Sequence, residues 1–161
     1  MLVVTEDRIR AAIVLNRQTG DSAREAVNLV NLAAIATTRG LADRARGFLR
    51  ESIAIAERIG SKRAGIVQVE CCLGLAALVG DWERAALMHG AAEALAEEMS
   101  QQREPMESLY LAPLIARTRD ALGTEGFSAA ERPGRRLSYE EAIAQARELV
   151  DESVGSDPIF L

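Results

Sequence analysis

Cysteine and histidine are scarce in this chain, and the shortage argues against several kinds of site. The two cysteines, Cys71 and Cys72, are adjacent, which is poor geometry for a structural disulfide. A reducing cytoplasm is therefore the expected compartment. With one histidine, His89, the chain lacks the spaced Cys and His ligands that a zinc site needs. We expect no bound metal and no cofactor.

Long apolar runs and an excess of basic residues are also missing. No apolar run approaches the ~20 residues of a membrane span. The apolar residues 1–4 are followed at once by polar and acidic ones, which fits neither a signal peptide nor an anchor. The net charge of −5 opposes binding to phosphate backbones. We therefore expect neither membrane insertion nor direct binding of nucleic acid. The one basic cluster, typical of a solvated turn, is Arg132, Arg135 and Arg136.

Aromatic residues make up only 4% of the 161 residues, whereas alanine, leucine, glutamate and arginine are abundant. This balance favours helices over strands. Apolar residues at 48% and charged residues at 27% are typical of a soluble chain with a sizeable core. We predict one all-α domain over residues 1–152. A flexible tail is expected at residues 153–161, where glycine, serine and proline occur.

One segment recurs along the chain with a period of 40 residues. Residues 40–59 and 80–99 each begin with a turn glycine, continue with an acid and an arginine, and then carry Ala-x-x-x-large. A further echo lies at residues 12–20. A fixed period of this size predicts stacked antiparallel helical hairpins. The matching pairs are Gly40 and Gly80, Ala45 and Ala85, Leu49 and His89, and Ser52 and Ala92.

Apolar residues three and four apart predict about seven helices in this stack, with a capping helix at the C-terminal end. Pro113 lies inside one apolar run, and we predict a kink or a restart of the helix there. Ser138, with Glu141 three residues later, forms a capping box, and the helix that it opens is expected to seal the end of the stack. The expected helices cover residues 5–19, 23–39, 41–59, 62–79, 82–99, 106–122, 126–133 and 139–152.

The first predicted helix lacks the partner that the 40-residue register would place before it. Thr5 resembles its N-cap, because acids follow directly. Its apolar residues Ile9, Ile13 and Leu15 would then lie at an uncapped end of the stack. We expect either a homo-oligomer formed through this helix or a longer protein of which this chain is a piece.

The two full repeats resemble the tetratricopeptide repeat, whose second helix also carries Ala-x-x-x-aromatic-or-large. The period here is 40 residues where the standard unit has about 34, and the closing proline is absent. Longer helices account for the longer period. The resemblance implies a tetratricopeptide-like α-solenoid.

Three stretches occur in order between Ala64 and Val150: C-L-G-L-A-A-L-V-G-D-W-E-R-A-A-L-M-H-G-A-A-E-A-L, Y-L-A-P-L-I-A-R-T-R-D-A-L and L-S-Y-E-E-A-I-A-Q-A. Together they resemble the C-terminal region of large bacterial transcriptional regulators. In those proteins a signal-transduction ATPase module, often joined to a LuxR-type or winged-helix DNA-binding domain, precedes tetratricopeptide-like repeats. The resemblance implies a sensor or scaffold arm. No glycine-rich phosphate loop ending in Lys-Ser or Lys-Thr occurs here, so nucleotide binding is not implied.

Candidate catalytic groups are few. His89 occupies the large inward position of its repeat, which favours a buried, hydrogen-bonded packing role over catalysis. Cys71 and Cys72 point about 100° apart on a helix, and neither has a histidine close in sequence to activate it. Acid pairs such as Glu97 and Glu98 are adjacent and so face different directions. A hydrolase or transferase is the least favoured function, and we expect a non-enzymatic chain.

A stack of hairpins offers a groove, because the first helices of successive units line its concave side. The candidate groove residues include one acid, one base and a tyrosine, which suits an extended peptide or a partner helix. A protein-interaction or signal-sensing module is thus the leading hypothesis. The alternative is a receptor for a small ligand such as an inducer, which a deep apolar pocket with convergent polar groups would favour. The candidates are Val30, Thr37, Glu70, Ala77, Tyr110 and Arg117.

Overall fold

The computed structural model describes residues 2–101 and 105–152, and all regular structure in these two ranges is α-helical. The prediction of an all-α chain is confirmed for this part, whereas the predicted tail at residues 153–161 lies outside the described residues. The helices are α1 (Leu2–Thr19), α2 (Ser22–Thr38), α3 (Ala42–Ile59), α4 (Lys62–Leu78), α5 (Trp82–Glu98), α6 (Pro105–Gly134) and α7 (Tyr139–Asp151).

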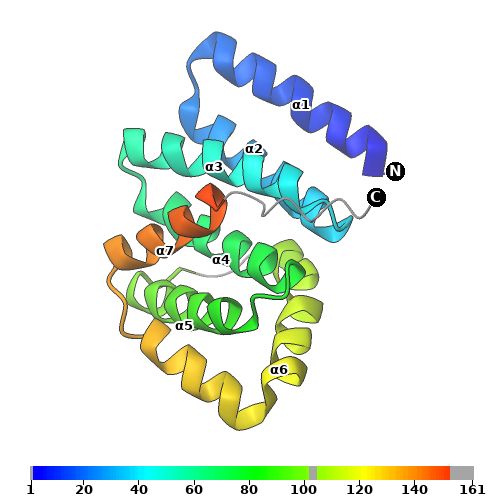
Figure 1. Cartoon of the computed structure of the whole chain (residues 1–161). Helices are drawn as coiled ribbons and strands as arrows, with labels where there is room; N and C mark the ends of the chain where they lie inside the picture. Colours follow the sequence, from blue (N-terminus) through cyan, green and yellow to red (C-terminus); the bar gives the residue numbers. More distant parts are fainter. Residues whose placement is uncertain (1, 102–104, 153–161) are drawn as a thin grey trace.

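Two helical hairpins, α2–α3 and α4–α5, stack on each other, with α1 packed on α2 at one end and α6 packed on α5 at the other (Figure 1). Gly20, Gly40, Gly60 and Gly80 all have φ between 69° and 78°, and Ser100 takes the equivalent position with φ 50°. Left-handed backbone of this kind ends helices, and glycine adopts it without strain. The structural repeat is therefore one helix plus its turn, which spans half of the 40-residue period.

Helix α4 is the centre of the fold. It contacts α2, α3, α5, α6 and α7, and every residue from Gln68 to Ala77 is buried. A helix that is apolar on all sides is stable only where other helices surround it. The unbroken apolar character of α4, relieved by Gln68 and Glu70, follows from this central place.

The long helix α6 bends at Gly123, whose φ of 71° and ψ of 168° are the only non-helical angles inside it. The helix continues through Pro113, so the predicted restart there is wrong; Pro113 is exposed, and its missing N–H costs one hydrogen bond without ending the helix. The segment before Gly123 packs on α4, where Leu111 lies beside Gly74, and the segment after it packs on α5. The bend lets one helix serve as a third hairpin (Figure 1).

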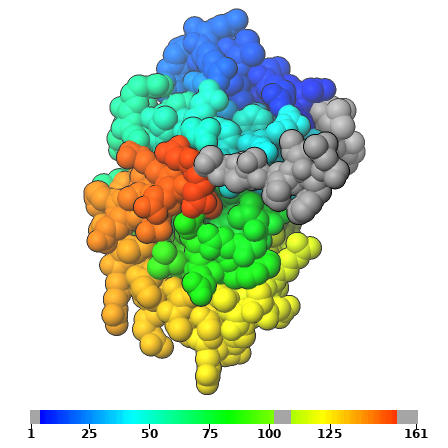
Figure 2. Space-filling model, in the orientation of Figure 1, coloured from blue at the N-terminus to red at the C-terminus, as the bar shows by residue number. Residues whose placement is uncertain are grey.

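Helix α7 begins with the predicted capping box: the Ser138 side chain accepts from the Glu141 N–H, and the Glu141 side chain accepts from the Ser138 N–H. The helix does not seal the end of the stack. It folds back onto α3, α4 and α5, with Tyr139 against Gly65 and with Arg50 3.1 Å from Asp151. Figure 2 shows its orange-red surface between the cyan surface of α3 and the green surface of α5.

Helix α1 starts at Leu2, so the predicted N-cap at Thr5 is wrong and Thr5 lies inside the helix. Ile13 is buried against α2, and Asn28 donates to Asn16 across the same contact at 2.9 Å. Leu15 points outward and is 58% exposed. The three residues expected to mediate self-association therefore do not form one face, because α2 already covers part of it.

Glu6 fastens α1 to the first hairpin. Its carboxylate accepts from Arg10 at 3.0 Å, from Arg39 at the end of α2 at 2.6 Å, and from Arg44 of α3 at 3.0 Å. Hydrogen bonds from Arg10 and then Arg39 hold the pKa of Glu6 below its ordinary value of 4.5. Three guanidinium groups around one carboxylate form a charge network that ties three helices together.

This network predicts acid sensitivity. Because the pKa of Glu6 is lower in the folded chain, its contribution to stability is present above pH 4.5 and is lost as the pH falls through the folded value. The variant Glu6→Gln should be less stable to urea than the parent chain at neutral pH, and the difference should close as the pH falls below 4.5. A difference that stays constant with pH would contradict the role given to this carboxylate.

Two helical glycines should respond oppositely to alanine. A Cβ at Gly90 would meet the Glu131 backbone oxygen of α6, whereas a Cβ at Gly47, on the exposed face of α3, would meet nothing within 4 Å. We expect Gly90→Ala to lower the free energy of unfolding by about 1–3 kcal/mol through overpacking. Gly47→Ala should raise it by about 0.5–1 kcal/mol through helix propensity. Urea unfolding measures both, and equal effects would contradict the packing of α6 on α5.

Candidate functional site

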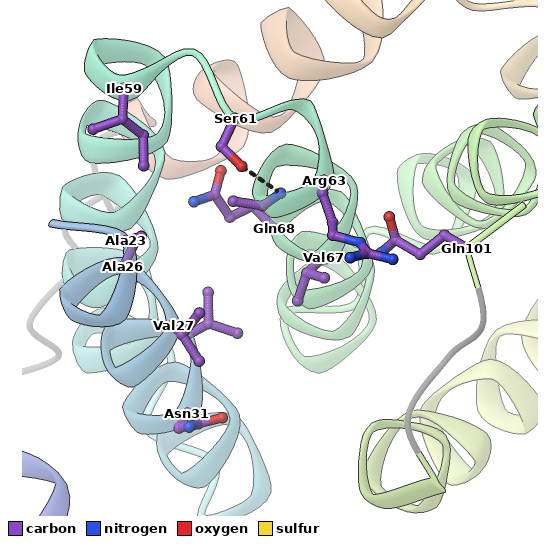
Figure 3. Close-up of a pocket in the computed structure, with 12 residues that line it drawn as sticks. Ala23, Ala26, Val27, Asn31, Ile59, Ser61, Arg63, Val67, Gln68 and Gln101 are labelled. Carbon is purple, nitrogen blue, oxygen red and sulfur yellow. Dashed lines mark hydrogen bonds between the residues drawn. The ribbon is translucent and has the colours of Figure 1, made fainter. Parts of the chain in front are cut away.

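A pocket of about 390 Å³ lies between the two first helices of the stacked hairpins, α2 and α4 (Figure 3). Its α2 wall is formed by residues of the first three turns, and all but one of them are apolar. The pocket therefore occupies the N-terminal half of the predicted groove. The α2 residues that line it are Ala23, Ala26, Val27, Val30 and Asn31.

The α4 wall carries the polar groups of the pocket. Ala23 and Arg63 are repeat equivalents, as are Val27 and Val67, because each pair stands 40 residues apart. The α3–α4 turn contributes Ile59 and Ser61, and Gln101 reaches the pocket from the chain that leaves α5. The lining residues of α4 itself are Arg63, Ala64, Val67 and Gln68.

Gln68 is held in one orientation at the floor of this pocket. Its side chain amide Nε2 donates to the carbonyl oxygen and to the Oγ of Ser52, both at 2.8 Å, and Ser52 Oγ donates to the Ala26 carbonyl at 2.9 Å. A backbone carbonyl can only accept, so the nitrogen and not the oxygen must face Ser52. The Oε1 atom therefore points away from Ser52, and it has no hydrogen-bond partner among the described residues.

Gln68 is only 1% exposed, and the unpartnered oxygen is unusual for that reason. The Oε1 atom of Gln101, across the pocket, is also buried and without a partner in the described part of the chain. Leaving a buried acceptor unsatisfied costs roughly 1–3 kcal/mol, and most such atoms in proteins are paired. Two unpaired acceptors on one pocket indicate a place for hydrogen-bond donors.

The charge of the pocket is opposite in sign to that of the chain. None of its twelve lining residues is acidic, and the only charged one is Arg63, although the whole chain carries −5. Arg63 is exposed and makes no ion pair within residues 2–101 and 105–152. In Figure 3 its guanidinium group extends across the pocket toward Gln101.

The structure brings only one of the six predicted groove residues, Val30, to this pocket. Thr37 is 4% exposed and donates to the Ala33 carbonyl at 2.9 Å, and Ala77 is 2% exposed in the core. Glu70 is 3% exposed. These positions do not line an open groove, because α2 and the first part of α6 both pack on α4 there.

The two predicted groove residues on α6 are also separated from the pocket. The Tyr110 hydroxyl donates to Cys71 Sγ at 3.1 Å, and burial raises the pKa of Tyr110. Arg117 is exposed on α6. The residues that sequence reasoning missed are Arg63, Gln68 and Gln101, and the available signal was Gln68, an amide inside an otherwise apolar stretch of helix.

The groups considered for catalysis lie in the helix packing. His89 Nδ1 is 3.1 Å from Glu131 Oε2, and its ring meets Phe127 edge to face at 5.5 Å. The side chain of His89 is 12% exposed, and burial lowers its pKa despite the nearby acid. Burial also raises the pKa of Cys72, which keeps that thiol protonated. His89 thus has an acid beside it, but it sits between α5 and α6 and not in the pocket.

In the described residues no group of three or more Cys, His, Asp and Glu side chains is arranged to hold a metal ion. Among the described helices, none combines the length and the apolar character needed to cross a bilayer. Comparison of the chain with family models, with curated proteins and with solved structures gives no significant match.

Proposed function

We propose that this chain is a non-enzymatic sensing module that binds a small ligand between α2 and α4. The observation that supports the proposal most strongly is Gln68, a fully buried amide that is fixed by Ser52 and that turns an unpartnered oxygen toward the pocket. A buried acceptor with no protein partner is suited to a donor supplied by a ligand.

The size and lining of the pocket support a small ligand over an extended peptide. Its volume of about 390 Å³ falls within the roughly 300–1,000 Å³ of small-molecule sites, which are mostly apolar with a few convergent polar groups. A peptide lying along the whole groove would need access to Thr37, Glu70 and Ala77, and these are buried. Of the functions that the sequence leaves open, the small-ligand receptor therefore has the better support.

The position of the pocket suggests how binding is sensed. Its walls belong to two successive hairpins, and Gln68 and Ser52 link α4 to α3 directly below it. A ligand that contacts both hairpins favours the arrangement in which they are packed as described, and any looser arrangement loses population. The proposal includes no catalytic step, and the lining contains no Cys, His, Asp or Glu.

The resemblance to the C-terminal arms of bacterial regulators adds a context to this proposal. A sensing pocket in such an arm would pass the ligand signal to an ATPase and DNA-binding module elsewhere in the protein. The support for this context is the set of three motifs between Ala64 and Val150. An ATPase module encoded directly upstream would strengthen it.

Blocking the pocket tests the proposed function. Val27 lines the pocket and is 56% exposed, whereas Val14 on α1 is 54% exposed and lies outside it. Tryptophan at either site should be tolerated, but Val27→Trp should occupy ligand space. Against a panel of small carboxylates, amines, sugars and nucleosides, we expect at least one compound to raise the melting temperature in a concentration-dependent way.

The same compound should lose its effect on Val27→Trp and keep it on the control Val14→Trp. The proposed function is wrong if no member of the panel stabilises the parent chain, or if Val27→Trp responds as strongly as the control.

A further inference from the structure

We infer that the ligand of the α2–α4 pocket is a small carboxylate that also carries neutral N–H donors and an aliphatic group. An N-acylated amino acid has this chemistry, and so does the free C-terminus of a peptide. The inference rests on the proposed function and names the class of ligand that the pocket recognises.

The donors are required by the two glutamine oxygens. Gln68 Oε1 cannot exchange places with its nitrogen, because the Ser52 carbonyl already fixes that nitrogen. Gln101 Oε1 presents a second buried acceptor at the other side of the pocket. The lining has no carboxylate to balance an ammonium group, so the matching donors are neutral, as amide N–H groups are.

The carboxylate is required by Arg63. Its guanidinium group is the only charge in the lining and is not used in an ion pair by the described residues. The planar fork of a guanidinium matches the two oxygens of a carboxylate. A phosphate group fits less well, because the site offers a single cation and because the Ala64 N–H at the start of α4 already donates to Ser61.

The aliphatic group is required by the remaining walls. Val27 and Val30 of α2 face Val67 of α4 across the pocket, with alanines between them. Val27 is 56% exposed in the unliganded chain, so an aliphatic side chain that covers it removes apolar surface from water. Donors, charge and apolar surface thus occur together within one cavity of about 390 Å³.

Three related compounds test this assignment on the full chain by titration calorimetry. N-Acetyl-L-leucine has the carboxylate, the amide N–H and the aliphatic side chain. N-Acetyl-L-leucine amide lacks the charge, and 4-methylpentanoate lacks the amide. We expect the first compound to bind about tenfold or more tightly than either of the others, the ratio that one charge-assisted contact provides.

A matched pair of arginine variants tests the role of the charge. Arg63→Gln should weaken binding of N-acetyl-L-leucine about tenfold and leave the amide compound unchanged. Arg24→Gln removes a guanidinium from the first turn of α2, outside the lining, and should change neither affinity. An acetylated pentapeptide ending in leucine separates the two sources: equal affinity assigns the site to peptide C-termini, and weaker affinity assigns it to the free compound.

The inference is overturned if the uncharged amide or the simple carboxylate binds as tightly as N-acetyl-L-leucine, or if none of the three binds. The proposed function fails by a different route. If other members of the compound panel stabilise the parent chain and lose their effect on Val27→Trp, the pocket is a receptor site for another class of ligand.

Discussion

The enclosure of α4 is the constraint on which the rest of the structure depends. Five helices contact it, and its residues from Gln68 to Ala77 are buried without interruption. A helix in this position cannot carry polar side chains freely, because each buried polar group must find a partner. Gln68 meets this requirement with its nitrogen, through Ser52, and leaves its oxygen for the pocket. The candidate site is therefore a consequence of the way the core is built.

Glycines without a turn role make this enclosure possible. Gly65 admits Tyr139 of α7, Gly74 admits Leu111 of α6, and Gly90 admits the backbone of α6 at Glu131. In each case a Cβ would lie within 3.4 Å of the neighbouring helix. Glycine inside a helix lowers helix propensity, and here the gain is close approach of two more helices to the α4–α5 hairpin. The stack is consequently a compact bundle around α4, with α7 folded back along its side (Figure 2).

The sequence predicts the local features of this fold well and the long-range ones poorly. Turn glycines and apolar spacing locate α2 to α5 within a residue or two, and the capping box at Ser138 is present as predicted. The start of α1, the continuation of α6 through Pro113 and the position of α7 depend on contacts with distant segments, which helical spacing does not encode. For the site, the predicted groove between first helices contains a pocket, but its residues come from their N-terminal halves. Thr37, Glu70 and Ala77 are buried because α6 and α2 cover the other halves.

Native-state hydrogen exchange tests the central place of α4 most directly. If α4 is enclosed by five neighbours, its amides from residue 69 to residue 77 exchange only when the whole domain unfolds, with the highest opening free energies in the chain. Amides of α1, whose main contact is with α2, exchange through a smaller local opening. Opening free energies in α4 no higher than those in α1 would show that the helix is not the enclosed centre of the fold.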